Sequence, residues 1–172
     1  MSTTNASIVP PHLQGLLRHF ADLRDGTHGN GAVTRADKDQ LFSAAVSFLD
    51  RYARQALSEM NEVLLLASGS IRATGVTRSH SGDLSALWAL GWPEQERAGI
   101  PPITLEAFFG HNFHHPHLRG ATVGDWPLNV FSDSDAAAEL PTLRSIASAD
   151  LHNLVFQRDY RIVPAITRGG AH

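Results

Sequence analysis

The chain of 172 residues has the length of one domain, and its 42% hydrophobic and 18% charged residues are typical of a folded globular protein. It contains no cysteine, which excludes thiolate metal sites, iron–sulfur clusters and cysteine nucleophiles. With a net charge of −3 and no basic run, the protein is not expected to bind nucleic acid.

No segment of the sequence predicts a membrane span or a secretion signal. Residues 1–12 lack the basic and apolar regions of a signal peptide, and the most apolar run, at 63–67, is too short to cross a bilayer. We therefore expect a cytoplasmic protein with no membrane partner. Small and polar residues at 1–10 and 168–172 predict flexible tails around a single globular domain at 11–167.

The first element expected along the chain is a helix over 11–24. Its apolar residues recur every three or four positions, and Pro11 suits the first turn. Glycines at positions 26, 29 and 31 then interrupt the chain. His28 falls in this break, and we expect it to be a loop residue without a partner.

A capping pair, Thr34 and Asp37, predicts the start of a long second helix. Apolar residues follow at alternating spacings of four and three over 42–63. Two interpretations fit this repeat. In one, a core helix ends near Asn61 and residues 63–67 turn into a strand. In the other, the repeat packs on a second subunit and forms a homodimer.

The middle of the chain predicts strands. Residues 71–78 are rich in β-branched side chains and predict one strand. The alternation of apolar residues at 84–92 favours a second strand, antiparallel to the first, although a helical face also fits. A charged loop is expected at 93–102, and the apolar run at 103–109 fits either a strand or a helix.

The last third combines extended and helical patterns. Residues 121–131 predict an extended piece, and an apolar stripe at 141–156 predicts a helix. A final edge strand is expected at 160–166, because Pro164 cannot donate to a sheet ladder. The order of elements indicates an α+β fold, a mainly antiparallel sheet packed with one long helix in the N-terminal half and a C-terminal helix.

Four of the ten histidines lie within residues 110–120. Pro116 disfavours a helical conformation at His115, so His115 and His117 are expected to project to the same side of an extended backbone. His111 is a plausible third member, and His114 would point away. Three neutral imidazoles predict a site for a divalent transition metal, iron or zinc, with positions left for water or substrate.

The His-x-His spacing of His115 and His117 resembles the ligand pair of cupins. A cupin places a glutamate three or four residues after that pair, whereas this chain offers none near Thr122, and the long helix before the strands is also foreign to cupins. The cupin fold is therefore not expected. Asp83 and Asp125 are the candidate carboxylates that would complete a site with two histidines.

Three further side chains are candidate catalytic residues. His80 and His152 could act as remote ligands or as acids and bases, because an imidazole titrates near neutral pH. Arg119 could hold an anionic group of the substrate through its planar guanidinium. Alternatively, such an arginine forms a surface ion pair, and the clustered histidines have structural roles only.

Three functions follow from these patterns. The first is a small enzyme, a metal-dependent oxidoreductase or lyase, that acts on a small organic molecule with an aromatic or carboxylated body. The second is a metal-free lyase or isomerase that uses histidine as acid or base. The third is a non-catalytic binding module that dimerises through the helix at 42–63.

Overall fold

One antiparallel sheet of six strands organises the part of the chain that the structure, a computed structural model, describes: residues 8–29 and 31–168. The strand order is β1-β3-β4-β5-β6, and the short β2 also pairs with β3. The strands are β1 (Ser70–Ala73), β2 (Thr77–Arg78), β3 (Leu84–Gly91), β4 (Ile103–Phe109), β5 (His117–Gly120) and β6 (Trp126–Pro127).

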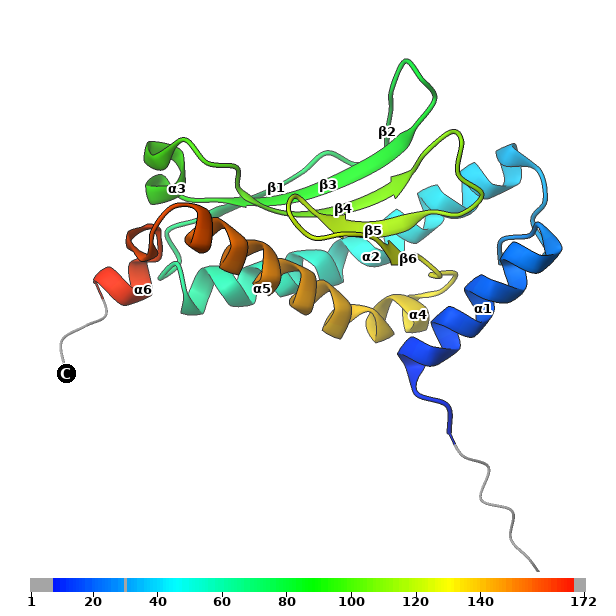
Figure 1. The fold of residues 1–172 in the computed structure, drawn as a ribbon, viewed down its shortest axis with the longest axis horizontal. Coiled ribbons are helices and arrows are strands. Elements are labelled where there is room, and N and C mark those ends of the chain that lie inside the picture. Colours follow the sequence, from blue (N-terminus) through cyan, green and yellow to red (C-terminus); the bar gives the residue numbers. More distant parts are fainter. Residues whose placement is uncertain (1–7, 30, 169–172) are drawn as a thin grey trace, which may run out of the picture.

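The helices α2 and α5 lie along the same face of this sheet (Figure 1). The helices are α1 (Pro11–Asp25), α2 (Arg35–Val63), α3 (Pro93–Ala98), α4 (Asp133–Ala138), α5 (Leu140–Gln157) and α6 (Pro164–Thr167), with a 3-10 turn, η1, at Tyr160–Ile162. This arrangement confirms the predicted α+β class, the long helix of the N-terminal half and the C-terminal helix.

The long helix α2 begins as its capping pair predicts and forms the centre of the core. The Thr34 hydroxyl accepts a hydrogen bond from the Asp37 amide at 3.2 Å. The predicted stripe is buried from Phe42 to Met60 between the sheet and α5. This face is therefore covered within the chain itself, and a homodimer would have to use another surface.

The strand predicted at 63–67 is wrong. The helix continues to Val63, and the chain then turns through Leu66 and Ala67, whose φ angles of 51° and 57° lie in the left-handed region. Two consecutive residues in this conformation cannot continue a β-strand, and they reverse the chain so that β1 can enter the sheet.

The strands at the centre of the sheet form as the alternation predicts. Buried and partly buried residues alternate along β3 and β4, because one face of the sheet packs on the helices. The pairing of β3 with the predicted strand at 71–78 is antiparallel, with Ile71 opposite Leu90. That strand is split into β1 and β2 around Gly75, which has a φ of 66°.

Two predictions about the other segments are wrong because proline begins a short helix at each place. The expected loop at 93–102 contains α3, in which Pro93 is a first-turn residue and the Gln95 side chain accepts from the Trp92 amide at 3.2 Å. The expected edge strand at 160–166 is η1 followed by α6, which begins at Pro164.

The extended piece expected at 121–131 contributes only two residues to the sheet, as β6. The tails expected at 1–10 and 168–172 lie almost entirely outside the described residues. None of the helices in the described part of the chain is long and apolar enough to cross a membrane.

The first helix, α1, forms at the predicted position but does not bury its apolar residues. Leu13, Leu17 and Phe20 are 43%, 61% and 57% exposed. The buried residue of this helix is instead a carboxylate, Asp22. The helix lies against β6, with its C-terminal end beside the start of α2 (Figure 1). The polar side of α1 is thus the side that faces the rest of the molecule.

Candidate metal centre

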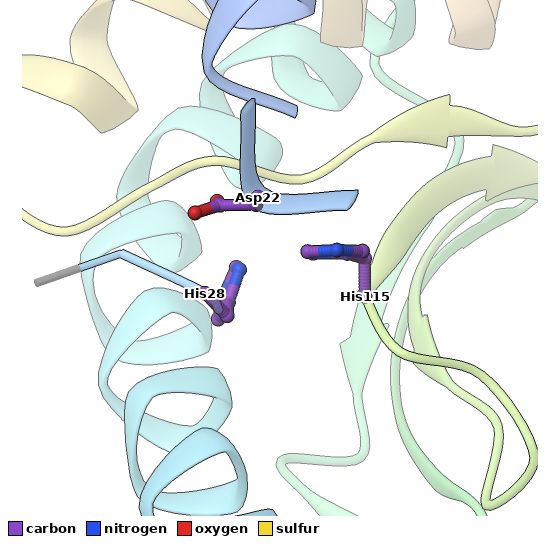
Figure 2. A group of neighbouring side chains, drawn as sticks. All are labelled: Asp22, His28 and His115. Atoms are coloured by element: carbon purple, nitrogen blue, oxygen red, sulfur yellow. The ribbon is translucent and has the colours of Figure 1, made fainter. Parts of the chain in front are cut away.

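Three buried side chains from separate segments gather around a common space, as Figure 2 shows. Asp22 comes from the last turns of α1, His28 from the loop after it, and His115 from the residues just before β5. One ligand atom from each lies within 4.8 Å of the others, and the three residues are 6%, 2% and 3% exposed.

The loop after α1 places Asp22 and His28 together. The helix ends at Gly26, whose φ of 68° turns the chain back. The Thr27 hydroxyl then donates to the Asp22 carboxylate at 2.7 Å, which holds the loop on the helix. The backbone amide of His28 donates to the carbonyl of Ala32 at 2.9 Å and fixes the histidine itself.

The neighbouring Gly29 makes this loop conformation possible. Its φ is 58°, and an added Cβ would lie 2.4 Å from Cε1 of Phe131. A side chain at this position would therefore combine backbone strain with a steric overlap. The close approach of Phe131 also brings its ring to 5.0 Å from that of His28, between centroids, and keeps the imidazole away from water.

The segment before β5 brings His115 to the same place. Pro116 follows it, and the Pro116 carbonyl accepts from the Leu128 amide at 3.1 Å, which holds this extended segment beside β6. On the other side, Lys38 of α2 donates to the His114 carbonyl at 3.4 Å. Tertiary contacts from both directions thus fix the position of His115.

The imidazoles of this group lack hydrogen-bond partners. Among the described residues, both ring nitrogens of His115 and the Nδ1 atoms of His28 and His19 are buried without a partner. The His19 ring packs edge-on against that of His115, with 4.8 Å between centroids. Leaving a buried polar atom unpaired typically costs on the order of 1–3 kcal/mol, so the cluster favours a ligand that accepts these lone pairs.

Burial lowers the pKa of His28 to about 4 and that of His115 to about 4, which keeps both imidazoles neutral at pH 7. The pKa of His19 is lowered as well, first by burial and then by the neighbouring His117. A metal ion binds the neutral imidazole and the ionised carboxylate. The protonation state of the two histidines therefore matches that of metal ligands.

Two imidazoles and one carboxylate are a ligand set that suits zinc, iron(II) and related divalent transition metals. Three protein ligands leave positions at the ion for water or substrate. His19 is a further imidazole beside the group: it is half-buried, and its ring centroid lies 4.8 Å from that of His115.

The structure brings together only part of the histidine set predicted from the sequence. His115 belongs to the buried group. The ring of His117 packs against that of His19 at 5.9 Å between centroids, one ring removed from the three ligand atoms. His111 lies apart and forms its own pair with Asp83, with 3.0 Å between Nδ1 and Oδ1. His114 is exposed, as expected.

The three candidate catalytic residues lie elsewhere. His80 is exposed in the turn between β2 and β3, and His152 is exposed on α5, where its ring stacks on Phe156. Arg119 donates to the Glu106 carboxylate at 2.7 and 3.2 Å. Its guanidinium is thus engaged within the sheet. The candidate carboxylate Asp125 is exposed.

Sequence reasoning missed Asp22, His28 and His19. His28, expected to be a loop residue without a partner, is instead buried in the group. The one available signal was the spacing of His19 and Asp22, which places two ligating side chains on one face of a helix whose apolar face is elsewhere. No local sequence pattern predicts that they contact His115, which lies almost a hundred residues later in the chain.

Comparisons with protein-family models, with curated proteins and with solved structures find no match. The chemistry of the centre is therefore inferred from the geometry of this chain alone. That geometry consists of three candidate ligands, two imidazoles and one carboxylate, in one buried place, with the imidazoles neutral and without partners among the described residues.

Proposed function

We propose that this protein is a small metal-dependent enzyme in which Asp22, His28 and His115 hold one divalent transition metal. One observation carries this proposal. His115 is 3% exposed, and neither ring nitrogen has a partner in the part of the chain that the structure describes, yet a carboxylate oxygen and a second imidazole nitrogen lie within 4.8 Å of its ligand atom. Such an arrangement is unfavourable without an ion and favourable with one.

The metal would act on a small organic molecule at the coordination positions that the protein leaves open. Zinc in such a site lowers the pKa of bound water and polarises a carbonyl, as in a lyase, whereas iron(II) with two histidines and one carboxylate supports oxidoreductase chemistry. His19, next to His115, is the residue placed to move a proton between the centre and the surface.

The test is metal binding with a matched pair of variants. Protein stripped with a chelator should take up one cobalt(II) ion per chain, and the visible absorption bands of the ion should report a low-symmetry nitrogen and oxygen site. The variant His115→Ala should lose at least a hundredfold in affinity, because a buried ligand is removed. The variant His111→Ala changes the same loop outside the group and should bind as the wild type does.

Absence of cobalt from the wild-type protein, or equal affinity in the two variants, would exclude this centre. The thermal midpoint of each stripped variant shows whether the chain is folded under the conditions of the titration. His115→Asn serves as a second variant, since it keeps a polar side chain at the position if alanine destabilises the fold.

A second candidate function rests on His111 and requires no metal. Asp83 accepts from the backbone amide of His111 at 2.7 Å and lies 3.0 Å from its Nδ1. The His111 amide, the His111 ring and Ser81 together lower the pKa of Asp83 to about 2, so the carboxylate is ionised and can hold Nδ1–H. Nε2 of the half-exposed ring is then available as an acid or base.

The two candidates are distinguished by one comparison. Activity that survives chelation and falls in His111→Ala supports the acid–base site. Activity that is lost on chelation, restored by a metal and retained in His111→Ala supports the buried centre. A panel of small carbonyl and aromatic compounds, screened with and without added zinc or iron(II), provides the assay.

A further inference from the structure

A pocket of about 210 Å³ lies beneath the N-terminal half of α1. Apolar walls come from Leu16 of α1, from Trp126 of β6 and from Pro141 of α5. Trp126 is 43% exposed and, with Pro141, also lines a second hollow of about 330 Å³ on its other side. An aromatic ring between two hollows, with aliphatic side chains around it, is typical of a site for a small organic ligand.

One carboxylate sets the charge of this pocket. Glu139, between α4 and α5, lines it and forms no ion pair with any of the described residues. Burial raises the pKa of Glu139, and the nearby Asp135 raises it further, against a hydrogen bond from Thr142 that lowers it. Among the described residues, the lining holds no arginine or lysine, and its other titratable side chain is that of His12 on α1. Glu139 is thus a carboxylate without a permanently charged cation beside it.

Helix α1 contributes residues both to this pocket and to the metal centre. Gly15, which lines the pocket, is followed on the same face by His19 and Asp22 at four and seven residues, about 10 Å away along the helix axis. Asn129 is a buried polar residue beside Gly15. It is 7% exposed, its amide donates to the Gly15 carbonyl at 3.0 Å, and its Oδ1 has no partner.

Several polar atoms on or against α1 lack hydrogen-bond partners among the described residues. Among the described residues, the buried side-chain nitrogen and oxygen atoms without partners are those of Asn129, His19, His28 and His115, together with one oxygen of the distant Glu94. His19 lies on α1 and His28 in the loop after it, while Asn129 and His115 each contact a residue of α1. A polar group of a bound molecule, or a chain of waters, would satisfy them.

We infer that the pocket between α1, β6 and the start of α5 binds a small primary amine with an aromatic or aliphatic body, and that this amine is the substrate class of the metal centre. The body packs on Trp126 and Leu16, and the ammonium group pairs with Glu139. The second half of this inference rests on the proposed function. The first half, amine binding, stands on the pocket alone.

The experiment uses two probes of the same size and opposite charge, 2-phenylethylamine and 3-phenylpropionate. Each is titrated into the full chain while the indole N–H signals are followed by NMR. We expect the amine to shift the signal of Trp126, which the variant Trp126→Phe assigns, and to bind at least tenfold more tightly than the acid. Glu139→Gln should remove this preference, because the carboxylate is its source.

Steric variants of one residue provide the matched control. An added Cβ at Gly15 meets no atom within 4 Å, so Gly15→Ala should fold at least as well as the wild type and still bind the amine. Gly15→Leu places a larger side chain in the pocket and should abolish binding. Equal binding of the two probes, or amine binding that neither Glu139→Gln nor Gly15→Leu weakens, overturns the inference.

A zinc titration of the same samples separates the two proposals. If the amine binds and the protein takes up no zinc, amine binding by the pocket is supported. The link between the pocket and the centre is then overturned, together with the proposed function. If zinc binds and the amine does not, the centre stands and the pocket is overturned. Binding of both, with zinc changing the affinity for the amine, supports the inference in full.

Discussion

His111 and His115 lie four residues apart in one loop, yet their surroundings are opposite. The His111 side chain is 47% exposed and has a carboxylate partner, Asp83, at 3.0 Å. His115 is 3% exposed, and neither of its ring nitrogens has a hydrogen-bond partner among the described residues. The difference teaches that the number of histidines in a segment does not define a site. A site is defined by the elements, distant in sequence, that pack against each ring.

The elements that meet the two rings differ in kind. His111 follows the end of β4, where Arg35 of α2 donates to its carbonyl at 3.2 Å, and it reaches only a turn of the sheet. His115 precedes β5 and lies beneath α1, where Asp22 and His28 close over it. The second environment stabilises the neutral ring or a bound ion, because burial disfavours the charged imidazolium.

The largest expected effect is the acid sensitivity of the metal-free protein. His28 and His115 have a pKa of about 4 in the folded chain, below the ordinary 6.5. The unfolded chain therefore takes up protons first as the pH falls, and stability is lost between pH 6.5 and 4, by on the order of 3 kcal/mol for each histidine. Urea unfolding of chelator-treated protein at intervals from pH 7 to 4 measures this slope.

Two variants show how much each histidine contributes to the dependence of stability on pH. His115→Phe removes a titrating group from the buried site and should flatten the curve. His111→Ala should leave the curve as it is in the wild type. A slope that is unchanged in His115→Phe would show that the buried ring is not held neutral.

Zinc binding should raise the free energy of unfolding by about as much as the protonation of one buried histidine lowers it. A ligand that binds only the folded state at a hundred times its Kd adds about 2.7 kcal/mol to the free energy of unfolding. The thermal midpoint should rise by several degrees with zinc and fall back with a chelator in the wild type and in His111→Ala. If zinc raises the midpoint of His115→Ala by the same amount, the ion binds elsewhere.

A smaller effect is expected from the loop that carries His28. Gly29→Ala combines a φ of 58° with a Cβ placed 2.4 Å from Phe131, and it should cost about 2 kcal/mol and weaken zinc binding. Gly26→Ala shares the left-handed conformation, with a φ of 68°, but meets no atom within 4 Å. It should cost about 1 kcal/mol and leave the zinc affinity unchanged. Chemical unfolding and zinc titration of both variants measure the difference.

The smallest effect is expected from the exposed pair. Asp83→Asn removes the carboxylate beside His111, in a region where solvent screens the interaction. Its thermal midpoint should change less than that of any variant above, and its zinc affinity should equal that of the wild type. A loss of zinc binding in Asp83→Asn would erase the distinction between the two histidines.

The fold was accessible from the sequence wherever a pattern was local and long. The capping pair at Thr34 and the stripe of α2 predicted the central helix, and the alternation at 84–92 predicted β3, because each pattern reports burial of one face. Proline misled at α3 and α6, since the same residue suits a loop, an edge strand or the first turn of a helix.

The site was accessible only in part, for a physical reason. Pro116 and the density of histidines drew attention to the segment that carries His115. The partners Asp22 and His28 are brought to it by the packing of α1 over the sheet, which no spacing in the sequence encodes. The apolar period of α1 gave no indication of its buried residue, because Leu13, Leu17 and Leu23 are exposed while Asp22 is buried.

The most direct test of the central claim is the NMR signal of each imidazole nitrogen, recorded with and without one equivalent of zinc. The nitrogen-15 shifts of His28 and His115 should move to the values of metal-bound imidazole, while those of His111 should not change. Metal-induced shifts at His111, or none at His28 and His115, would contradict the assignment of the buried group as the metal centre.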